Sequence, residues 1–151
     1  MILPMDESIA ARTPGEVGRE WFEKVWGERN RSAIFGLLAA DGVGHLEGGM
    51  ETVGPEAFAQ FHDQLTSAFP DSRLKIHRIV EQDNQVCVHW EFMGTHSGEG
   101  FGLAATGEEI SFCGMTWFIV RGGMIVEGWD GWNHGGLMAR LGAPDEVIRL
   151  K

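Results

Sequence analysis

Residues 110–132 read ISFCGMTWFIVRGGMIVEGWDGW, two apolar runs on either side of a Gly-Gly pair. This pattern is typical of a β-hairpin and predicts strands over Ile110–Val120 and Met124–Trp132. The first of these strands is apolar on both of its faces, whereas one layer of helices can cover only one face of a sheet. We therefore expect a second copy of the chain to cover the other face, as a homodimer through the sheet.

The segments before this hairpin extend the sheet and supply the helices. Period-two alternation begins at residue 73, and a turn at Asp83-Asn84 joins two further strands, which completes a four-strand meander. Thr13 and Glu16 form a capping box at the start of the first helix. Because helices and strands are segregated, the fold class is α+β, with a curved mixed or antiparallel sheet and helices packed on its concave face. Helices are expected at 14–30, 32–39, 54–69 and 135–141. One further short strand is expected at 43–46.

The length of 151 residues is that of one domain. We expect a single domain over 14–143, a poorly ordered N-terminal extension at 1–13 and a C-terminal tail at 144–151. No apolar stretch approaches the ~20 residues that span a membrane. No targeting segment is recognisable at the N-terminus either, so we expect a cytoplasmic protein.

Composition narrows the range of partners. Asp and Glu number 22 against 12 Lys and Arg, a formal charge of −10, and the basic residues form no cluster. Such a field repels phosphate, which argues against nucleic acid and anionic membranes as partners. Cys87 and Cys113 lie far apart inside apolar runs, so we expect two buried thiols in a reducing compartment. Tyr is absent, which excludes any mechanism that needs a phenol.

Five short segments carry a resemblance to a known family. They are WFEKVW at 21–26, AFPD at 68–71, GTHSG at 94–98, TG at 106–107 and IVEGWD at 125–130. Together they resemble the SnoaL-like polyketide cyclase family, within the nuclear transport factor-like superfamily of cone-shaped α+β barrels, over roughly 17–143. The resemblance implies an enzyme with no metal and no organic cofactor. In such an enzyme a pocket aspartate, which falls on Asp130 here, removes a carbon-bound proton, and the enolate closes a ring by intramolecular aldol chemistry.

The sequence around Asp130 is consistent with that role. On its strand, Asp130 shares a face with Val126, Gly128 and Trp132, and a carboxylate among apolar neighbours is costly unless it is paired or protonated. Desolvation would raise its pKa toward the range that a general base needs. The alternative is a structural Asp130 that caps the turn before the helix at 135–141.

The hairpin register decides which residues stand beside Asp130. A plain two-residue turn places Asp130 opposite Met115 and on one face with Trp117, whereas a bulge beside the glycines brings Thr116 alongside instead. The sequence leaves both registers open, so Met115, Thr116 and Trp117 are all candidate substrate contacts. In the resembled family a polar residue, often His, stands at the position of Thr116 and assists the aspartate.

Histidines are a second group of candidates. His45, on the short strand near the expected barrel mouth, is a candidate catalytic residue by resemblance, or else a hydrogen-bonded surface histidine. His96, at the entry of the Gly-rich loop 94–107, either lines the pocket or orders the loop, and the loop itself is either a lid or an irregular connection. His62 lies off the apolar stripe of its helix and is assigned no chemistry. The six histidines lack the spacing of a metal site, so no metal is expected.

Aromatic side chains offer walls for a flat apolar ligand. Any one of them is also explained by core packing, whereas a cone-shaped scaffold needs some of the set to line its cavity. The candidates for substrate binding are Phe22, Trp26, Phe58, Phe61, Trp90, Phe101 and Trp132.

The expected function is that of a cofactor-free enzyme that acts on an apolar or aromatic small molecule, as a polyketide or ester cyclase does. Ketosteroid isomerase-like and scytalone dehydratase-like sites fit less well, because both depend on Tyr. An epoxide hydrolase-like site needs an Arg between two carboxylates, and Arg78 is the only central-strand candidate. The sequence also leaves open a non-catalytic binder of an apolar small molecule.

Overall fold

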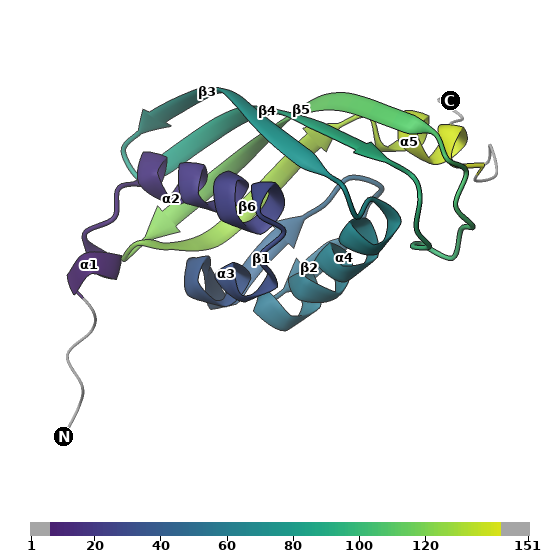
Figure 1. Ribbon diagram of the computed structural model, residues 1–151. Helices are drawn as coiled ribbons and strands as arrows, with labels where there is room; N and C mark the ends of the chain where they lie inside the picture. The colour runs from purple at the N-terminus through teal and green to yellow at the C-terminus, as the bar shows by residue number, and fades with distance from the viewer. Residues whose placement is uncertain (1–6, 143–151) are drawn as a thin grey trace.

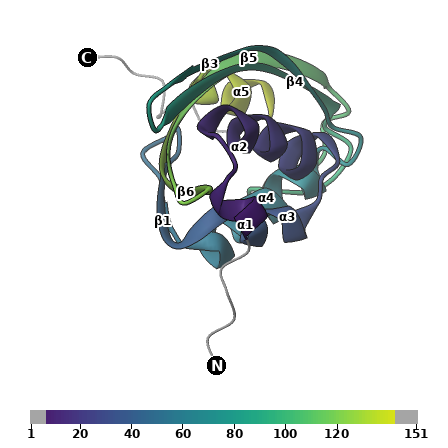
Figure 2. The same ribbon diagram turned by 90° about the vertical axis from the view of Figure 1, so that its left-hand side faces the viewer.

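The computed structural model describes residues 7–142, in which a curved sheet wraps around helices (Figure 1). Seen along the sheet, α2 lies inside the curve, and α3 and α4 close its open side (Figure 2). The predicted tail at 144–151 lies outside the described residues. The elements are α1 (Glu7–Ala10), α2 (Pro14–Glu20), η1 (Trp21–Gly27), α3 (Arg31–Leu37), β1 (Leu38–His45), β2 (Glu51–Val53), α4 (Pro55–Ala68), β3 (Arg73–Gln82), β4 (Gln85–Thr95), β5 (Glu109–Arg121), β6 (Met124–Trp132) and α5 (His134–Arg140).

All six strands belong to one sheet, in the order β2-β1-β6-β5-β4-β3. β1 is parallel to β6, and the other neighbouring pairs are antiparallel. The α+β class, the mixed sheet and the meander are thus confirmed. The sheet stays open, because its edge strands β2 and β3 are not paired with each other among the described residues, so the cone is closed by helices and not by hydrogen bonds. The sequence did not predict β2, which is too short for an alternation to show.

The first helix changes type halfway along. Thr13 accepts a hydrogen bond from the Glu16 N–H, which confirms the predicted cap. From Trp21 the chain continues as the π-helix η1, in which the Glu28 N–H donates to the Glu23 carbonyl five residues earlier. The wider turn gives η1 a broad apolar side that faces the sheet. Its buried residues are Trp21, Phe22, Val25 and Trp26.

The β5–β6 hairpin contains a bulge that decides the register. Ile125 and Glu127 pair with consecutive residues of β5, so Val126 between them is the extra residue. Beyond this bulge, Asp130 stands opposite Thr116. Of the two registers that the sequence left open, the structure has the bulged one.

The bulge corrects two of the candidate substrate contacts. Met115 and Trp117 alternate with Thr116, so they point away from Asp130 to the outer face, where they are 58% and 49% exposed. The prediction that they line the pocket is wrong for this reason. The same bulge turns Ile125, in place of Val126, toward the interior.

The outer face also holds Cys113, which is exposed, while Cys87 is partly buried. The expectation of two buried thiols is therefore wrong for Cys113, since the burial alternation of β5 turns it outward. Within the predicted extension, Arg12 donates to the carbonyl oxygens of Gly36 and Gly123, which ties this segment to the hairpin turn. Among the described residues, no helix is long and apolar enough to cross a membrane.

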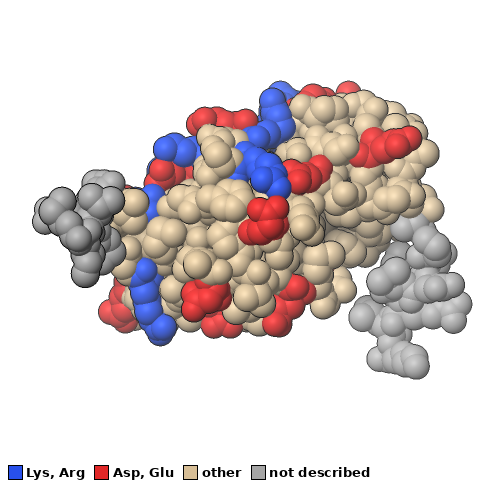
Figure 3. Space-filling view, turned by 90° about the horizontal axis from the view of Figure 1, so that it is seen from below, with Lys and Arg blue, Asp and Glu red and all other residues tan. Residues whose placement is uncertain are grey.

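Basic side chains on the helices and on the segment between α1 and α2 are paired with acidic ones. Lys24 and Arg12 both contact Glu20, and Arg31 contacts Asp63 at 2.9 Å. Seen from below, Lys and Arg side chains stand among Asp and Glu side chains (Figure 3). This face of the molecule therefore presents a mixed surface and no basic patch.

Candidate active site

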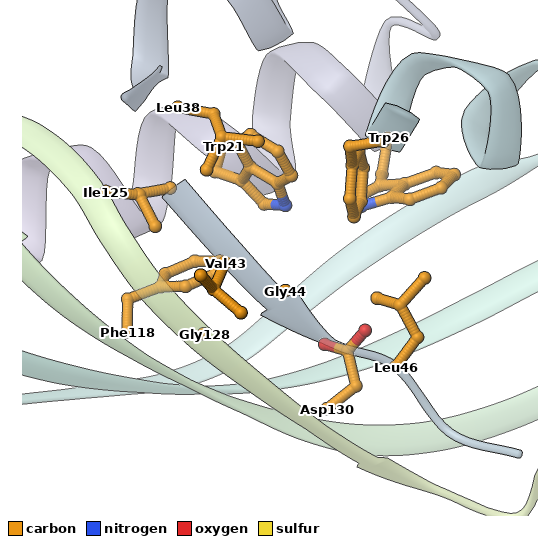
Figure 4. Close-up of a pocket in the computed structure, with 11 residues that line it drawn as sticks. Trp21, Trp26, Leu38, Val43, Gly44, Leu46, Phe118, Ile125, Gly128 and Asp130 are labelled. Carbon is orange, nitrogen blue, oxygen red and sulfur yellow. The ribbon is translucent and has the colours of Figure 1, made fainter. Parts of the chain in front are cut away.

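Two apolar compartments lie on the inner side of the sheet and share Trp26 and Asp130 as walls. Their volumes are about 30 and about 40 Å³, enough for one or two water molecules each. A larger ligand therefore needs side chains to move, and Trp26 is the wall whose movement would join the compartments. The first (Figure 4) is lined by Trp21, Trp26, Leu38, Val43, Gly44, Leu46, Phe58, Phe118, Ile125, Gly128 and Asp130. The second is lined by Trp26, Phe61, Leu65, Leu74, Trp90, Phe92, Phe112, Asp130 and Trp132.

The carboxyl group of Asp130 projects from β6 into this space (Figure 4). Burial raises its pKa from 3.8 to about 6, because the charged form is deprived of water; a hydrogen bond from Thr116 acts the other way, and the charge of Glu47 adds to the rise. Although the residue as a whole is only partly buried, its carboxyl group faces apolar walls. Of the described residues that line the compartments, Asp130 alone is titratable. A carboxyl with this pKa is populated in both protonation states near neutral pH, as an acid–base catalyst needs.

A chain of two hydrogen bonds holds this carboxyl from behind. The Trp90 indole N–H donates to Thr116 Oγ1 at 3.0 Å, and the Thr116 hydroxyl donates to Asp130 Oδ1 at 2.7 Å. Because an indole can only donate, it leaves the Thr116 hydroxyl to donate onward. Oδ1 is thereby fixed as an acceptor, so the proton that Asp130 gains or gives is carried on Oδ2.

Five of the seven aromatic candidates line the compartments: Trp26, Phe58, Phe61, Trp90 and Trp132. Phe22 does not line either one; it stacks behind Trp90 at 5.9 Å between ring centroids and belongs to the core. Four more aromatic side chains that the sequence did not single out also line the compartments: Trp21, Phe92, Phe112 and Phe118. Trp21 showed the same helical spacing as Trp26 and could have been included on that ground. Whether any of these residues binds substrate stays a prediction.

His45 does not reach the compartments. Its neighbours Gly44 and Leu46 line the first compartment, so His45, between them on the strand, points outward. There Nε2 lies 2.8 Å from Glu127, Nδ1 lies 3.2 Å from Glu51, and the ring stacks on Trp129. The structure therefore does not bring His45 together with Asp130, and a part for His45 in catalysis stays a prediction.

His96 and Phe101 belong to the loop, and neither lines a compartment. His96 is fully buried, and its Nδ1 accepts the Thr106 N–H across the loop, so His96 orders the loop. Phe101 packs against Phe61, which does line the second compartment. The Gly98 N–H and the Phe101 N–H bond to the C-terminal half of α4, which fixes the loop beside that helix.

The structure buries His62, which the sequence placed off the apolar stripe of its helix. His62 is 1% exposed, lies against Trp26, and its Nε2–H donates to the Val25 carbonyl at 2.7 Å. Burial lowers the pKa of His62, and a neutral ring that donates through Nε2 has a bare Nδ1. His62 follows Phe58 by four residues, so helical spacing could have predicted its burial.

Three possible metal ligands do come together, on the outer face. His77, Glu91 and Cys113 stand on three neighbouring strands, with their ligand atoms within 4.8 Å of one another. Their contacts are already accounted for, since His77 and Ser111 each bond one oxygen of Glu91 and thereby lower the pKa of that carboxyl. Residues this far apart in sequence carry no spacing motif, and they lie on the opposite side of the sheet from Asp130.

The comparisons with known proteins agree with this fold. A model of the SnoaL-like polyketide cyclase family matches residues 16–141. No match was found among curated proteins. Of the solved structures, AclR, a proposed hydroxylase from Streptomyces galilaeus, is 27% identical, with a TM-score of 0.72 over 83% of this chain and 92% of its own. IdmH, a proposed polyketide cyclase from Streptomyces antibioticus, is 25% identical, with a TM-score of 0.73 over 87% and 100%.

A third structure is similar in fold at lower identity. It is a proposed SnoaL-like polyketide cyclase from Jannaschia sp., 17% identical, with a TM-score of 0.77 over 95% of this chain and 98% of that one. The family model spans most of the chain, from the first turn of α2 to the end of α5. The chain belongs to the SnoaL-like polyketide cyclase family.

Proposed function

We propose that this chain is a cofactor-free enzyme of the polyketide cyclase type, in which Asp130 removes a proton from a carbon next to a carbonyl group. The observation that carries the proposal is the single carboxyl group in an apolar cavity, with its pKa raised to about 6. The family and the likeness to IdmH support the class of substrate, an apolar molecule with several carbonyl groups. Within residues 7–142, no cationic side chain forms an ion pair with this carboxylate.

The proposed reaction balances within one substrate molecule. Ionised Asp130 takes the proton from carbon onto Oδ2, and the enolate attacks a second carbonyl carbon of the same molecule. A carbon–carbon bond forms and the second carbonyl becomes an alkoxide, which then takes the proton back from Asp130. Nothing is oxidised or reduced, and the carboxyl ends in the state in which it began.

The test measures proton removal without requiring the natural substrate. An aromatic β-keto ester in D₂O is followed by NMR, and the protein is expected to accelerate exchange at the activated carbon above the buffer rate. Asp130→Asn should reduce this acceleration by at least about 100-fold, the usual size of a general-base contribution. Glu127→Gln removes a carboxylate of the same strand on the outer face and should leave the rate unchanged.

Two outcomes would count against the proposal. If Asp130→Asn exchanges the proton as fast as the wild type, the carboxyl is not the base. If the ester binds, as measured by Trp fluorescence, but exchange never exceeds the buffer rate, the chain is a binder of apolar molecules and not an enzyme.

A further inference from the structure

The walls of the two compartments contain one kind of hydrogen-bond donor. Apart from Asp130, their lining side chains are aliphatic or aromatic, so the only N–H or O–H groups they offer are the indole N–H groups of tryptophan. The Trp90 indole is already engaged, because it donates to Thr116. Of the remaining tryptophans, Trp21 and Trp26 line the first compartment together with Asp130.

These two indoles belong to buried residues, but their N–H groups are open to the cavity and lack an acceptor. Trp21 is 3% and Trp26 is 8% exposed, and neither indole N–H makes a hydrogen bond within residues 7–142. A tryptophan N–H that faces an otherwise apolar cavity is stabilised by an acceptor placed there, as tryptophan N–H groups inside proteins commonly are. Figure 4 shows both indole nitrogens on the ring edges that face the cavity, on the side toward the Asp130 carboxyl. The missing acceptor is therefore one that enters the cavity.

The π-helix explains how both donors reach the same cavity. Trp21 and Trp26 are five residues apart, and in an α-helix such residues point about 140° away from each other. In η1 the hydrogen bonds span five residues, so one turn is wider and brings residues five apart close to alignment. Both side chains thereby point from the helix toward β6, the strand that carries Asp130 (Figure 4).

We propose that the indole N–H groups of Trp21 and Trp26 hold the carbonyl oxygen of the substrate and stabilise the negative charge that develops on it. This role rests on the function proposed for Asp130. Donors aimed at a developing oxyanion in a cavity without water lower the barrier to proton removal. No cation lines either compartment, so the ligand is an uncharged carbonyl compound with apolar surface around the carbonyl group, and not a carboxylate or a phosphate.

A matched pair of ligands isolates the contribution of these donors. α-Tetralone and tetralin share one ring skeleton and differ in the carbonyl oxygen, and both are titrated into ¹⁵N-labelled protein at pH 8. At that pH Asp130, with its pKa of about 6, is ionised and donates nothing to a ketone. The ketone is expected to move the indole signals of Trp21 and Trp26 downfield and tetralin to move them much less. The outer-face signals of Trp117 and Trp129 serve as internal controls.

Substitutions then test the affinity. The wild type should bind the ketone about fivefold more tightly than the hydrocarbon, the value of one ordinary hydrogen bond, and the ratio should approach one in Trp21→Phe/Trp26→Phe. Taking the ratio within each variant cancels the packing change, since both ligands meet the same smaller wall. Trp129→Phe should keep the wild-type ratio.

The proposal fails if both ligands shift the two signals equally, if the ratio survives in the double variant, or if neither ligand moves either signal up to its solubility limit. It fails separately from the function proposed above, because these measurements need no turnover. Ketone-specific shifts without proton exchange would leave the donors in place and remove Asp130 as the base. Exchange without ketone-specific shifts would do the reverse.

Discussion

The two faces of the β5–β6 hairpin hold carboxylates in opposite surroundings. On the outer face, Glu127 lies 2.8 Å from His45 and is partly exposed to water. Three residues along, Asp130 points inward, accepts a bond from a neutral hydroxyl, and meets apolar walls. The same strand thus carries a carboxylate that is already satisfied and one that is not. Chemistry is expected at the second, because its pKa is shifted by burial with no partner to hold the charge.

Neutralising the inner carboxylate should produce the largest effect on stability. With its pKa raised from 3.8 to about 6, ionised Asp130 opposes folding by up to about 3 kcal/mol. The stabilisation from the protonated Asp130 carboxyl is fully present below pH 3.8 and is lost as the pH rises to about 6. Above that pH the contribution of Asp130 to the free energy of unfolding no longer changes with pH. Asp130→Asn should therefore be more stable than the wild type at pH 8, and this advantage should grow between pH 4 and 6 in urea unfolding.

The stability of the matched outer-face variant, Glu127→Gln, relative to the wild type should not change between pH 4 and 6. If Asp130→Asn and the wild type unfold with the same free energy at both ends of the pH range, the carboxyl is solvated. The contrast between the faces would then disappear, and with it the physical basis for a base at this position.

Removing the Thr116 hydroxyl, which donates to Asp130, should increase the difference between the inner and the outer carboxylate. Thr116→Val takes away the one bond that favours the ionised form, so the pKa of Asp130 should rise beyond about 6, by the equivalent of about 1.5–3 kcal/mol. Carbon-detected NMR of the carboxyl signal, assigned with Asp130→Asn, measures the shift. Thr116→Ser keeps a hydroxyl and should keep the wild-type value; an unchanged pKa in Thr116→Val would show that the bond does not act on the ionised state.

Local patterns were enough to predict most of the fold. The N-cap at Thr13, the alternation from residue 73 onward and the Gly-Gly turn each depend on a few neighbouring residues, and each appears in the structure. The Glu16 side chain, the other half of the predicted capping box, makes no bond to the Thr13 N–H among the described residues. The resemblance carried by IVEGWD at 125–130 implied a pocket position for Asp130, and Asp130 and five of the aromatic candidates do line the compartments. The fold class and the position of the candidate base follow from short-range information.

What could not be predicted depends on contacts between distant segments. One extra residue, Val126, turns over the rest of its strand and replaces Met115 by Thr116 opposite Asp130. The alternation in the sequence is equally consistent with both registers. His45 lies on a strand interrupted by glycines, so no alternation marks its direction. The π-helix keeps an apolar stripe that an α-helix would also show, so only the folded backbone reveals that Trp21 and Trp26 lie on one side.

The outer face of the sheet exposes apolar side chains that could mediate self-association. Met115, Trp117 and Trp129 are 58%, 49% and 39% exposed on the outer face of neighbouring strands, and the predicted homodimer would cover them. Trp117→Glu is expected to weaken self-association by more than tenfold, about 1.4 kcal/mol, in sedimentation velocity at micromolar concentration. Phe35→Glu, an equally exposed position on α3, should leave it unchanged. A wild type that sediments as a monomer would contradict the prediction.

The smallest effect is expected where the outer face looks most like an active site. His45 has two carboxylates and an indole around it, yet these contacts are partly exposed, and ion pairs at such positions contribute at most about 1 kcal/mol. His45→Ala should therefore lower the free energy of unfolding by less than that and leave proton exchange within about twofold of the wild type. A tenfold loss of exchange with unchanged stability would mean that β1 transmits the state of His45 to the cavity through Gly44, and the two faces would have to be treated as one site.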